Sequence, residues 1–300
     1  MKSKTNKIKL LESSWTNPKK LRDFYESSRN DIIEFMKSRD RPDFKLIIKD
    51  SDSNRDVIFI IPTPDISGQN SQNILQELEN ERIIFVESNG QYFNFSFSCN
   101  RGIERAIKEN TDWIIICNDD VLINGKIDSV LLELRKTDAD VVLPAKTREI
   151  VIFKHNLITH FLVGFNAICH NMHEEYRIRK NLTNKGILFY ESMFPTPFFT
   201  LKKLLSKHVT DSFPLSGHFI AARSFVFQRV KFDETFINGI EDMKLMIDIL
   251  RNNFNIKLME VEIDHIGGSS LESIQTKEIR HIRGLANKIY FTDLIEHEMR

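Results

Sequence analysis

The chain has 300 residues, of which 41% are hydrophobic and 28% are charged, as is typical of a globular protein. Its 42 basic and 42 acidic residues balance, so no overall field draws it to nucleic acid, and no apolar run approaches the roughly 18 residues of a membrane-spanning helix. The three scattered cysteines favour a reducing, cytoplasmic location. Lysines near the N-terminus are compatible with peripheral contact with the inner face of the membrane.

Residues 1–55 differ in pattern from those that follow. They begin with several lysines, and one short segment has apolar residues spaced as on one face of a helix: Ile32, Ile33, Phe35 and Met36. The polar stretch at residues 50–54 then indicates a linker. We therefore expect an N-terminal helical extension over residues 1–55, whose role the sequence does not reveal.

From residue 57 onward, short apolar runs alternate with amphipathic segments. The apolar runs predict buried strands over residues 57–61, 83–86, 113–117 and 141–143. The segments between them predict helices over residues 73–80 and 100–110 and another from residue 127. Strands and helices that alternate at this spacing are typical of βαβ units, so we predict an α/β domain whose mostly parallel central sheet is flanked by helices.

The alternation breaks in residues 150–210, an insert that includes an aromatic-rich segment at residues 189–200. It resumes with segments that predict a strand over 217–222, a helix over 241–252 and a strand over 257–263. Residues 271–300 predict a C-terminal helix. The main domain is therefore expected to span residues 56–270, with the insert inside it.

Polar side chains stand directly after the apolar run at residues 113–117. They are Asn118, Asp119 and Asp120. Open α/β sheets bind ligands outside the carboxyl ends of their strands, which is where these residues are expected. Carboxylate oxygens suit Mg²⁺ or Mn²⁺, and such ions usually bridge to phosphates of a substrate. The triplet thus indicates a metal-bound nucleotide diphosphate, and the simpler alternative is an acidic turn.

Two common nucleotide-binding motifs are absent from the chain. No G-x-G-x-x-G follows the strand predicted at residues 57–61, which disfavours a dinucleotide-binding fold of the usual kind. No G-x-x-x-x-G-K-[ST] occurs, which argues against a P-loop nucleotide hydrolase. Nucleotide binding is therefore expected to depend on carboxylates and a metal ion.

Several motifs, taken in order, resemble those of family 2 glycosyltransferases of GT-A fold, and most closely the rhamnosyltransferase-like branch. The motifs are Glu87-Ser88-Asn89-Gly90, Asn100-Arg101-Gly102, Asn118-Asp119-Asp120, Phe232-Asp233-Glu234-Thr235-Phe236 and Glu241-Asp242. The resemblance covers roughly residues 56–268 and implies a GT-A fold. It also implies a metal-dependent, inverting transfer of a sugar from a nucleotide-diphosphate donor to a hydroxyl of a glycan, glycolipid or glycoprotein.

The resemblance implies that Asp120 ligates a Mn²⁺ or Mg²⁺ ion that binds the donor diphosphate. His265 stands where a histidine completes the metal site in some relatives, although a lone histidine is more often structural. Asp119 or Asn118 would lie near the ribose and sugar of the donor. A metal ion would be needed because the leaving nucleoside diphosphate develops negative charge, which a bound cation stabilises.

The same resemblance implies that Asp242 is the general base that deprotonates the acceptor hydroxyl. Glu241 is the alternate base, or a contact to the acceptor. The simpler alternative is that both acids stand in the first turn of a helix because its dipole favours negative charge there. Gly217 and His218 are candidates for the acceptor site, and the insert at residues 150–210 is expected to select the acceptor.

A nucleoside pocket is expected to include Pro62, Thr63, Glu87 and Asn89. The family commonly has Asp where this chain has Glu87, so the nucleobase is not identified. A helix that starts near residue 100 would direct its N-terminal amides at a phosphate, with contributions from Asn100, Arg101 and Gly102. The plainer interpretation makes Arg101 a surface residue.

Two other functions remain open. A nucleotidyltransferase shares this kind of sheet but usually carries a Gly-rich basic loop after its first strand, where this chain has Pro62-Thr63-Pro64-Asp65. A non-catalytic glycan- or nucleotide-binding relative is disfavoured by the carboxylates at both the metal and the base positions. The expected partners are a nucleotide sugar and a carbohydrate or lipid-linked acceptor; the sequence discloses neither their identities nor the oligomeric state.

Overall fold

The computed structural model describes residues 27–51, 53–90, 93–145, 147–154, 187–192, 209–266 and 277–298. The chain divides into two compact units. One, the terminal unit, consists of residues 1–39, 148–214 and 276–300, and the other, the sheet unit, consists of residues 40–147 and 215–275. All the predicted site residues belong to the sheet unit. The N-terminal lysines up to residue 20, most of the insert and the aromatic residues after 192 lie outside the described residues.

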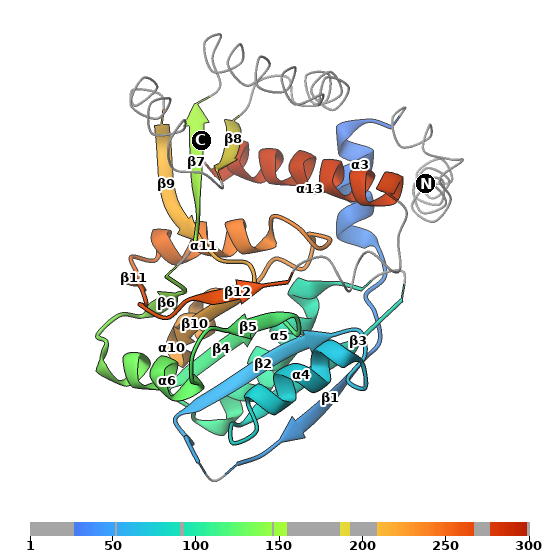
Figure 1. The fold of residues 1–300 in the computed structure, drawn as a ribbon. Coiled ribbons are helices and arrows are strands. Elements are labelled where there is room, and N and C mark those ends of the chain that lie inside the picture. Colours follow the sequence, from blue (N-terminus) through green and yellow to red (C-terminus); the bar gives the residue numbers. More distant parts are fainter. Residues whose placement is uncertain are drawn as a thin grey trace. The chain divides into compact units, whose positions relative to one another are not determined.

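The sheet unit is built on a seven-stranded sheet with the order β1-β3-β2-β4-β10-β6-β11 (Figure 1). Its strands are β1 (Phe44–Lys49), β2 (Val57–Thr63), β3 (Ile83–Ser88), β4 (Trp113–Cys117), β6 (Val141–Leu143), β10 (Phe219–Arg223) and β11 (Ile256–Leu258). β2 pairs in parallel with β3 and β4, and β6 pairs in parallel with β11. β1 and β10 run antiparallel to their neighbours, so the other strands all point the same way.

The predicted α/β class with a mostly parallel central sheet flanked by helices is confirmed. Two of its strands are not parallel, however. The strand predicted at residues 217–222 is the antiparallel β10, and β1 extends the sheet into the segment that we assigned to the N-terminal extension. β1 is an edge strand with mixed exposure and two lysines, so it lacks the continuous apolar run that marks a buried parallel strand.

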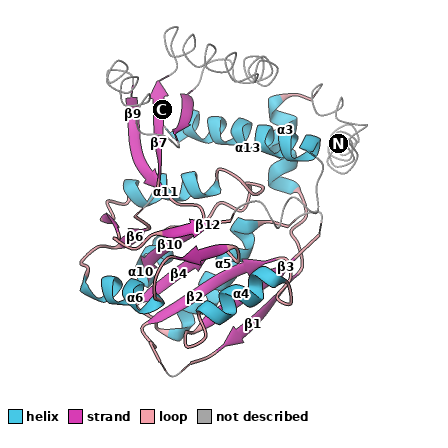
Figure 2. Ribbon diagram, in the orientation of Figure 1, coloured by secondary structure: helices cyan, strands magenta, loops and turns pink. Residues whose placement is uncertain are grey.

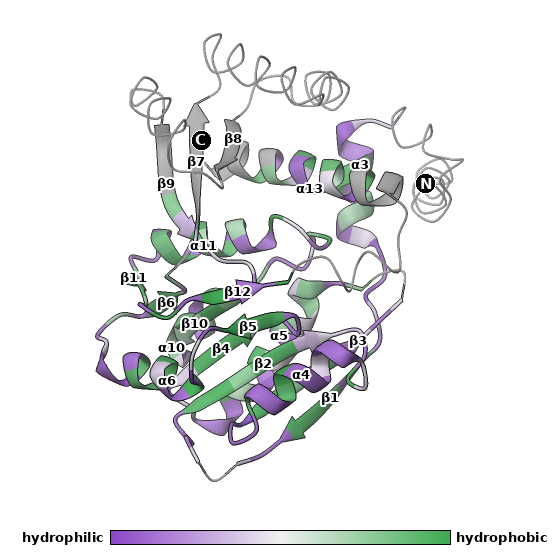
Figure 3. Cartoon of the chain, in the orientation of Figure 1, coloured by the Kyte–Doolittle hydropathy of each residue, from purple (hydrophilic) through white to green (hydrophobic). Residues whose placement is uncertain are grey.

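Helices cover both faces of this sheet (Figure 2). The helices of the sheet unit are α4 (Gln69–Glu77), α5 (Phe95–Ala106), α6 (Ile127–Lys136), α10 (Ser224–Arg229) and α11 (Glu241–Arg251). Ile74 of α4 and Leu134 of α6 share one core with Phe59 of β2, whereas α5 meets Ile60 on the opposite face. Every residue of β2 and β4 is therefore buried, which explains the apolar runs seen in green in Figure 3.

The predicted boundaries of two helices are wrong. The helix predicted at residues 73–80 is α4, which begins earlier, at Gln69. The helix predicted to begin at Asn100 is α5, which begins at Phe95 and is followed by a single 3₁₀ turn, Ile107–Glu109. The reason is the cap: the Asn94 side chain accepts a hydrogen bond from Phe97 N and satisfies a terminal N–H group there.

A two-stranded sheet completes the sheet unit. It pairs β5 (Val121–Ile123) antiparallel with β12 (Ile263–His265). The register sets His265 opposite Val121, next to Asp120. The predicted strand at residues 257–263 is thus two short strands, β11 and β12, in different sheets.

The terminal unit is described in part. It contains α3 (Arg29–Ser38), α13 (Lys277–Glu298) and a three-stranded sheet of β7 (Arg148–Lys154), β8 (Ile187–Ser192) and β9 (Val209–Leu215) in the order β8-β7-β9. α3 packs on α13, with an Arg29–Asp293 ion pair of 3.1 Å between them. Among the described residues, no helix is both long enough and apolar enough to cross a membrane.

Close packing at Gly102 gives a stability prediction. A methyl group at this position would overlap the Ile60 side chain and come within 3.1 Å of Val86 Cγ2. Gly102→Ala should therefore lower the free energy of unfolding by about 1–3 kcal/mol, measured by urea unfolding, because over-packing forces side chains out of their rotamers. Gly284→Ala in α13, where the added methyl meets nothing within 4 Å, should be neutral or slightly stabilising. Unchanged stability of Gly102→Ala would contradict this packing.

Candidate active site at the carboxyl ends of β2, β3 and β4

The predicted polar residues gather at the carboxyl ends of three neighbouring parallel strands. Thr63 is the last residue of β2 and pairs in register with Glu87 of β3. The Asn118-Asp119-Asp120 triplet follows β4 directly. Since these strands are parallel, their ends lie at one edge of the sheet, which is the position where open α/β sheets bind ligands.

Thr63 holds Asp119 in a buried hydrogen-bonded chain. Its hydroxyl donates to Asp119 Oδ2 at 2.7 Å and lies 2.8 Å from Ser71 Oγ. Burial raises the pKa of Asp119, an effect that the bond from Thr63 opposes and the neighbouring Asp120 reinforces. Thr63 is fully buried and its side chain orients Asp119; its contact with a nucleoside stays a prediction.

The other residues predicted for the nucleoside pocket differ in exposure. Pro62 is buried within β2 and Asn89 is exposed after β3. Glu87 is half-buried, and its carboxylate accepts a hydrogen bond of 3.0 Å from Ile66 N in the loop between β2 and α4. Glu87 thus ties that loop to the edge of the sheet and keeps it beside the triplet.

Asp120 and His265 form a close pair. His265 Nε2 lies 2.8 Å from Asp120 Oδ1, and Asp120 is only 6% exposed. A carboxylate only accepts, so Nε2 carries the hydrogen of this bond. Asn118 Nδ2 lies 3.3 Å from the same nitrogen. We call these three side chains the Asp120–His265 cluster.

The Asp120–His265 cluster fits a divalent cation by its donor chemistry. Asn118 Oδ1 is buried, and no donor reaches it among the described residues. A carboxylate, an imidazole and an amide oxygen without a partner suit Mn²⁺ or Mg²⁺. In the described part of the chain, no group of three or more His, Cys, Asp or Glu side chains is arranged for a metal, so phosphate oxygens and waters would have to complete the coordination shell.

Asp242 lies against Gly217. A methyl group added at Gly217 would overlap Asp242 Oδ2, so the carboxylate occupies the space that a side chain would need. Asp242 stands in the first turn of α11, and its Oδ1 accepts a hydrogen bond of 2.8 Å from Met243 N. The helix start therefore fixes this carboxylate from one side and Gly217 bounds it from the other.

The turn before α11 has an unusual backbone. Asn238, Gly239 and Ile240 all have positive φ, at 48°, 155° and 75°. Ile240 is β-branched, for which this conformation is strained. The Asn238 side chain holds the turn by accepting from Phe95 N at 2.9 Å and donating to Phe93 O at 3.1 Å. This turn sets where α11 begins and hence where Asp242 lies.

Glu241 is buried beside Asp242, with 7% of its surface exposed. Burial, reinforced by the Asp242 carboxylate, raises the pKa of Glu241 to about 8. Its Oε2 accepts a hydrogen bond from Gly239 N, so it is engaged with the turn before α11. A residue this buried is poorly placed to contact an acceptor, which was one of its two predicted roles. The raised pKa favours the protonated form of Glu241 at neutral pH.

Gly217 and His218 connect the two groups of acids. Gly217 adjoins Asp242, while the His218 ring stacks on the His265 ring with centroids 5.1 Å apart and planes within 5°. The His218 carbonyl also accepts a hydrogen bond of 2.9 Å from Asn118 N. One dipeptide thus lies between the predicted base and the predicted metal ligands.

Asn100 and Arg101 contact other parts of the protein, and the phosphate contact predicted for them stays a prediction. Both lie in the second turn of α5 and face the segment 232–236. Asn100 donates to Phe232 O at 2.9 Å and accepts from Phe232 N at 3.1 Å, and Arg101 pairs with Glu234 at 3.1 Å. Gly102 is packed against Ile60. The premise that a helix begins at residue 100, with free N-terminal amides there, is wrong, because α5 begins at Phe95.

Sequence reasoning missed three residues that help to build this region. Ser71 joins the Thr63 chain, Asn94 caps α5 and donates to Glu234 O and Phe236 O, and Asn238 holds the turn before α11. A partial signal was available for one of them: Asn238-Gly239 is a dipeptide typical of turns with positive φ.

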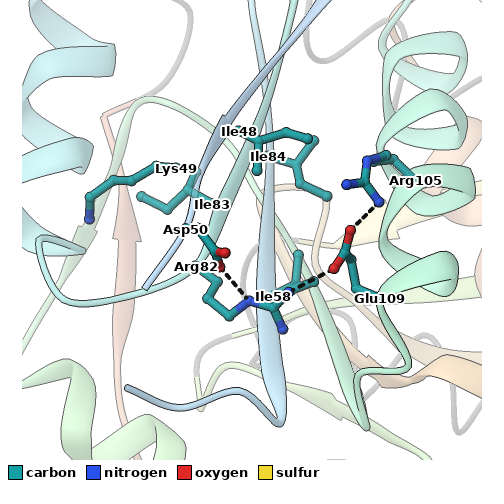
Figure 4. Close-up of a pocket in the computed structure, with 9 residues that line it drawn as sticks. All are labelled: Ile48, Lys49, Asp50, Ile58, Arg82, Ile83, Ile84, Arg105 and Glu109. Atoms are coloured by element: carbon teal, nitrogen blue, oxygen red, sulfur yellow. Dashed lines mark hydrogen bonds and ion pairs between the residues drawn. The ribbon is translucent and has the colours of Figure 1, made fainter. Parts of the chain in front are cut away.

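Two cavities lie elsewhere. One, of about 110 Å³, is lined by Ile58 and Ile83 near the amino ends of β2 and β3, at the edge of the sheet opposite the triplet (Figure 4). Its two arginines are paired: Arg82 with Asp50 and Glu109, and Arg105 with Glu109. The other, of about 420 Å³, lies between α3 and α13 in the terminal unit. Neither includes a predicted site residue.

Comparisons with known proteins give distant structural likenesses. Neither a scan against protein-family models nor a search of curated proteins found a match. Among solved structures, A197 from STIV is 10% identical, with 71% of this chain and 86% of that chain covered and a TM-score of 0.37. The inositol-1-phosphate CTP transferase of T. maritima is 10% identical, with coverages of 78% and 77% and a TM-score of 0.34.

A third solved structure is CMP:2-keto-3-deoxy-manno-octonic acid synthetase in complex with CTP. It is 14% identical, with 77% of this chain and 98% of that chain covered and a TM-score of 0.38. At TM-scores this low, the residues of this chain are what bear on its function. The resemblance to the rhamnosyltransferase-like branch stays a prediction.

Proposed function

We propose that the chain is a metal-dependent, inverting glycosyltransferase that moves a sugar from a nucleotide-diphosphate donor to a hydroxyl of a carbohydrate or lipid-linked acceptor. The supporting observation is the dipeptide Gly217-His218, which adjoins Asp242 through its first residue and His265 through its second. A carboxylate suited to accept a proton and a donor set suited to a cation are thus neighbours at one edge of the sheet.

In this proposal the Asp242 carboxylate accepts the proton of the acceptor hydroxyl. The hydroxyl oxygen then forms a bond to the anomeric carbon of the donor sugar. The bond from that carbon to the diphosphate oxygen breaks, and the nucleoside diphosphate leaves with the electron pair. One displacement inverts the anomeric configuration, so Asp242 acts on the face of the sugar opposite the leaving group.

Asp120 and His265 are the residues that would hold Mn²⁺ or Mg²⁺, with Asn118 beside them. To bind the ion through Nε2, His265 would have to give up the hydrogen that it donates to Asp120 and carry its hydrogen on Nδ1, because a metal-bound imidazole nitrogen carries none. When bound, such an ion supplies charge stabilisation to the diphosphate leaving group. Asp119 is not assigned as a ligand of the ion, because its carboxylate already accepts the hydrogen bond from the buried Thr63 hydroxyl. The tie from Glu87 to the β2–α4 loop keeps the edge of the sheet ordered for the nucleoside.

A thermal-shift screen of nucleoside diphosphates, each with and without Mn²⁺, tests this proposal. One of them should raise the Tm by about 5 °C at roughly 100 times its Kd, and only with the metal, because a ligand of the folded state alone stabilises it. Asp120→Asn should lose the metal-dependent part of the shift. Asp128→Asn, which changes an exposed aspartate of α6, is the matched control and should keep it.

Other outcomes distinguish the alternatives. Pyrophosphate release from a nucleoside triphosphate would favour a nucleotidyltransferase, although Pro62-Thr63-Pro64-Asp65 stands where such enzymes usually have a Gly-rich basic loop. Glycan binding without metal-dependent nucleotide affinity would favour a non-catalytic binding protein. Metal-independent nucleotide binding would remove the proposed role of the Asp120–His265 cluster.

A further inference from the structure

His218 is held through both its ring and its backbone. Its Nε2 lies 3.3 Å from Ile263 O, and since a carbonyl only accepts, Nε2 is the donor. The residue is also held through its backbone, because its carbonyl accepts from Asn118 N. The ring is therefore tied to β12 at one end, and the backbone is tied to the end of β4 at the other.

Apart from the bond of its Nε2 to Asp120, His265 stands in a small element of the fold. It is the last residue of β12, a strand of three residues in a two-stranded sheet, and 29% of its side chain is exposed. An imidazole at such a position can rotate about its terminal torsion, where energy wells are broad. The nearly parallel, stacked His218 ring covers one face of His265 and limits that rotation.

We propose that His218 is a positioning residue that holds the His265 ring with Nε2 directed at Asp120 and thereby prepares the Asp120–His265 cluster for a divalent cation. This inference rests on the proposed function, and it replaces the acceptor contact predicted for His218. Hydrogen-bonded partners that fix the ring of a metal-binding histidine commonly change metal affinity by 10- to 100-fold when they are removed, and we expect removal of a stacked ring to have an effect at the lower end of this range.

The first arm of the test uses metal-free protein labelled with ¹⁵N in its histidine rings. At mildly alkaline pH, the His265 signals of the wild type should show one tautomer, with the hydrogen on Nε2, as its bond to Asp120 requires. Loss of the stack in His218→Ala should give averaged or broadened His265 signals. Assignment comes from the signals that disappear in His265→Ala.

The second arm measures Mn²⁺ binding by electron paramagnetic resonance of free Mn²⁺. His218→Ala should weaken Mn²⁺ binding by at least about 10-fold. His218→Phe, which keeps a flat ring but not the nitrogen, should restore affinity to within about threefold. Arg223→Ala is the matched control: it removes a side chain stacked 4.2 Å from the Trp113 ring at the opposite end of β10 and should leave Mn²⁺ affinity unchanged.

The two arms separate this inference from the proposed function. If the wild type binds Mn²⁺ and folded His218→Ala binds it equally well with unchanged His265 signals, His218 does not position His265. If the wild type does not bind Mn²⁺ but His218→Ala alters the His265 tautomer, His218 positions His265 but does not prepare a site for Mn²⁺ alone, which overturns the metal part of this inference. The nucleotide screen, in which phosphates are present, still tests the proposed function. Should His218→Ala fail to fold, His218→Phe decides: affinity reduced more than 10-fold despite the retained ring would overturn the stacking argument.

Discussion

Asp242→Asn should lower the turnover number for sugar transfer by about 10³-fold, since a positioned general base typically contributes 10²- to 10⁴-fold. The amide is close in size to the carboxylate and can still accept from Met243 N, so the fold and donor binding should remain. The measurement is release of nucleoside diphosphate from the nucleotide sugar selected by the thermal-shift screen, with and without acceptor. Donor binding by thermal shift provides the control for folding.

A second variant tests the position of Asp242 separately from its charge. Gly217→Ala keeps the carboxylate but places a methyl group where Asp242 Oδ2 lies, so the side chain must move. A displacement of this kind can reduce rate by about 10²-fold. Asp128→Asn again provides a surface control. Full turnover in Asp242→Asn would eliminate Asp242 as the base, and full turnover in Gly217→Ala would mean that its observed position is not required.

Glu241→Gln should remove a pH dependence of stability that the wild type carries. Burial and the neighbouring Asp242 raise the pKa of Glu241 from 4.5 to about 8 in the folded state. The folded protein therefore favours the protonated acid, and the stability that this contributes is present below pH 4.5 and is lost as pH rises toward about 8. The loss should be on the order of a few kcal/mol, and a neutral glutamine avoids it.

Urea unfolding at pH 5 and pH 8, values chosen to bracket most of the interval between about 4.5 and 8, measures this effect. The titratable groups near Glu241 are Asp242 on the same helix and the buried Cys99 thiol of α5, whose pKa is raised by burial and by Glu241. Glu241→Gln should be more stable than the wild type at the higher pH. Glu79→Gln, at an exposed site, should follow the wild type. Equal pH dependence in wild type and Glu241→Gln would mean that Glu241 is ionised without penalty.

The buried strands and the acids at their ends could be predicted because their signals are local. β2 and β4 are covered on both faces, so each reads as an unbroken apolar run. Carboxylates directly after such a run must lie at the carboxyl edge of the sheet, as Asp119 and Asp120 do. The position of Glu241 and Asp242 at the start of α11 was likewise predictable, because apolar residues at helical spacing follow them.

The roles of Asn100, Arg101 and Thr63 could not be predicted in the same way. A polar side chain that binds a ligand and one that satisfies a backbone group look alike in a sequence. The Asn100 side chain donates a hydrogen bond to the backbone carbonyl of Phe232, more than a hundred residues away, and the Thr63 hydroxyl donates one to the Asp119 carboxylate. Buried polar groups are almost always paired, but the partner is decided by long-range packing.

By itself, the amino-acid sequence determined the α/β class, the main buried strands and the positions of the acids along the chain, because periodicity and burial act over a few neighbouring residues. Only the tertiary structure decided that β1 and β10 run antiparallel and that β12 brings His265 to Asp120. It also decided that Gly217 and His218 lie between the two groups of acids. The physical reason is that pairing of distant strands and contacts between their ends depend on the whole packed core and leave no periodic trace in the chain.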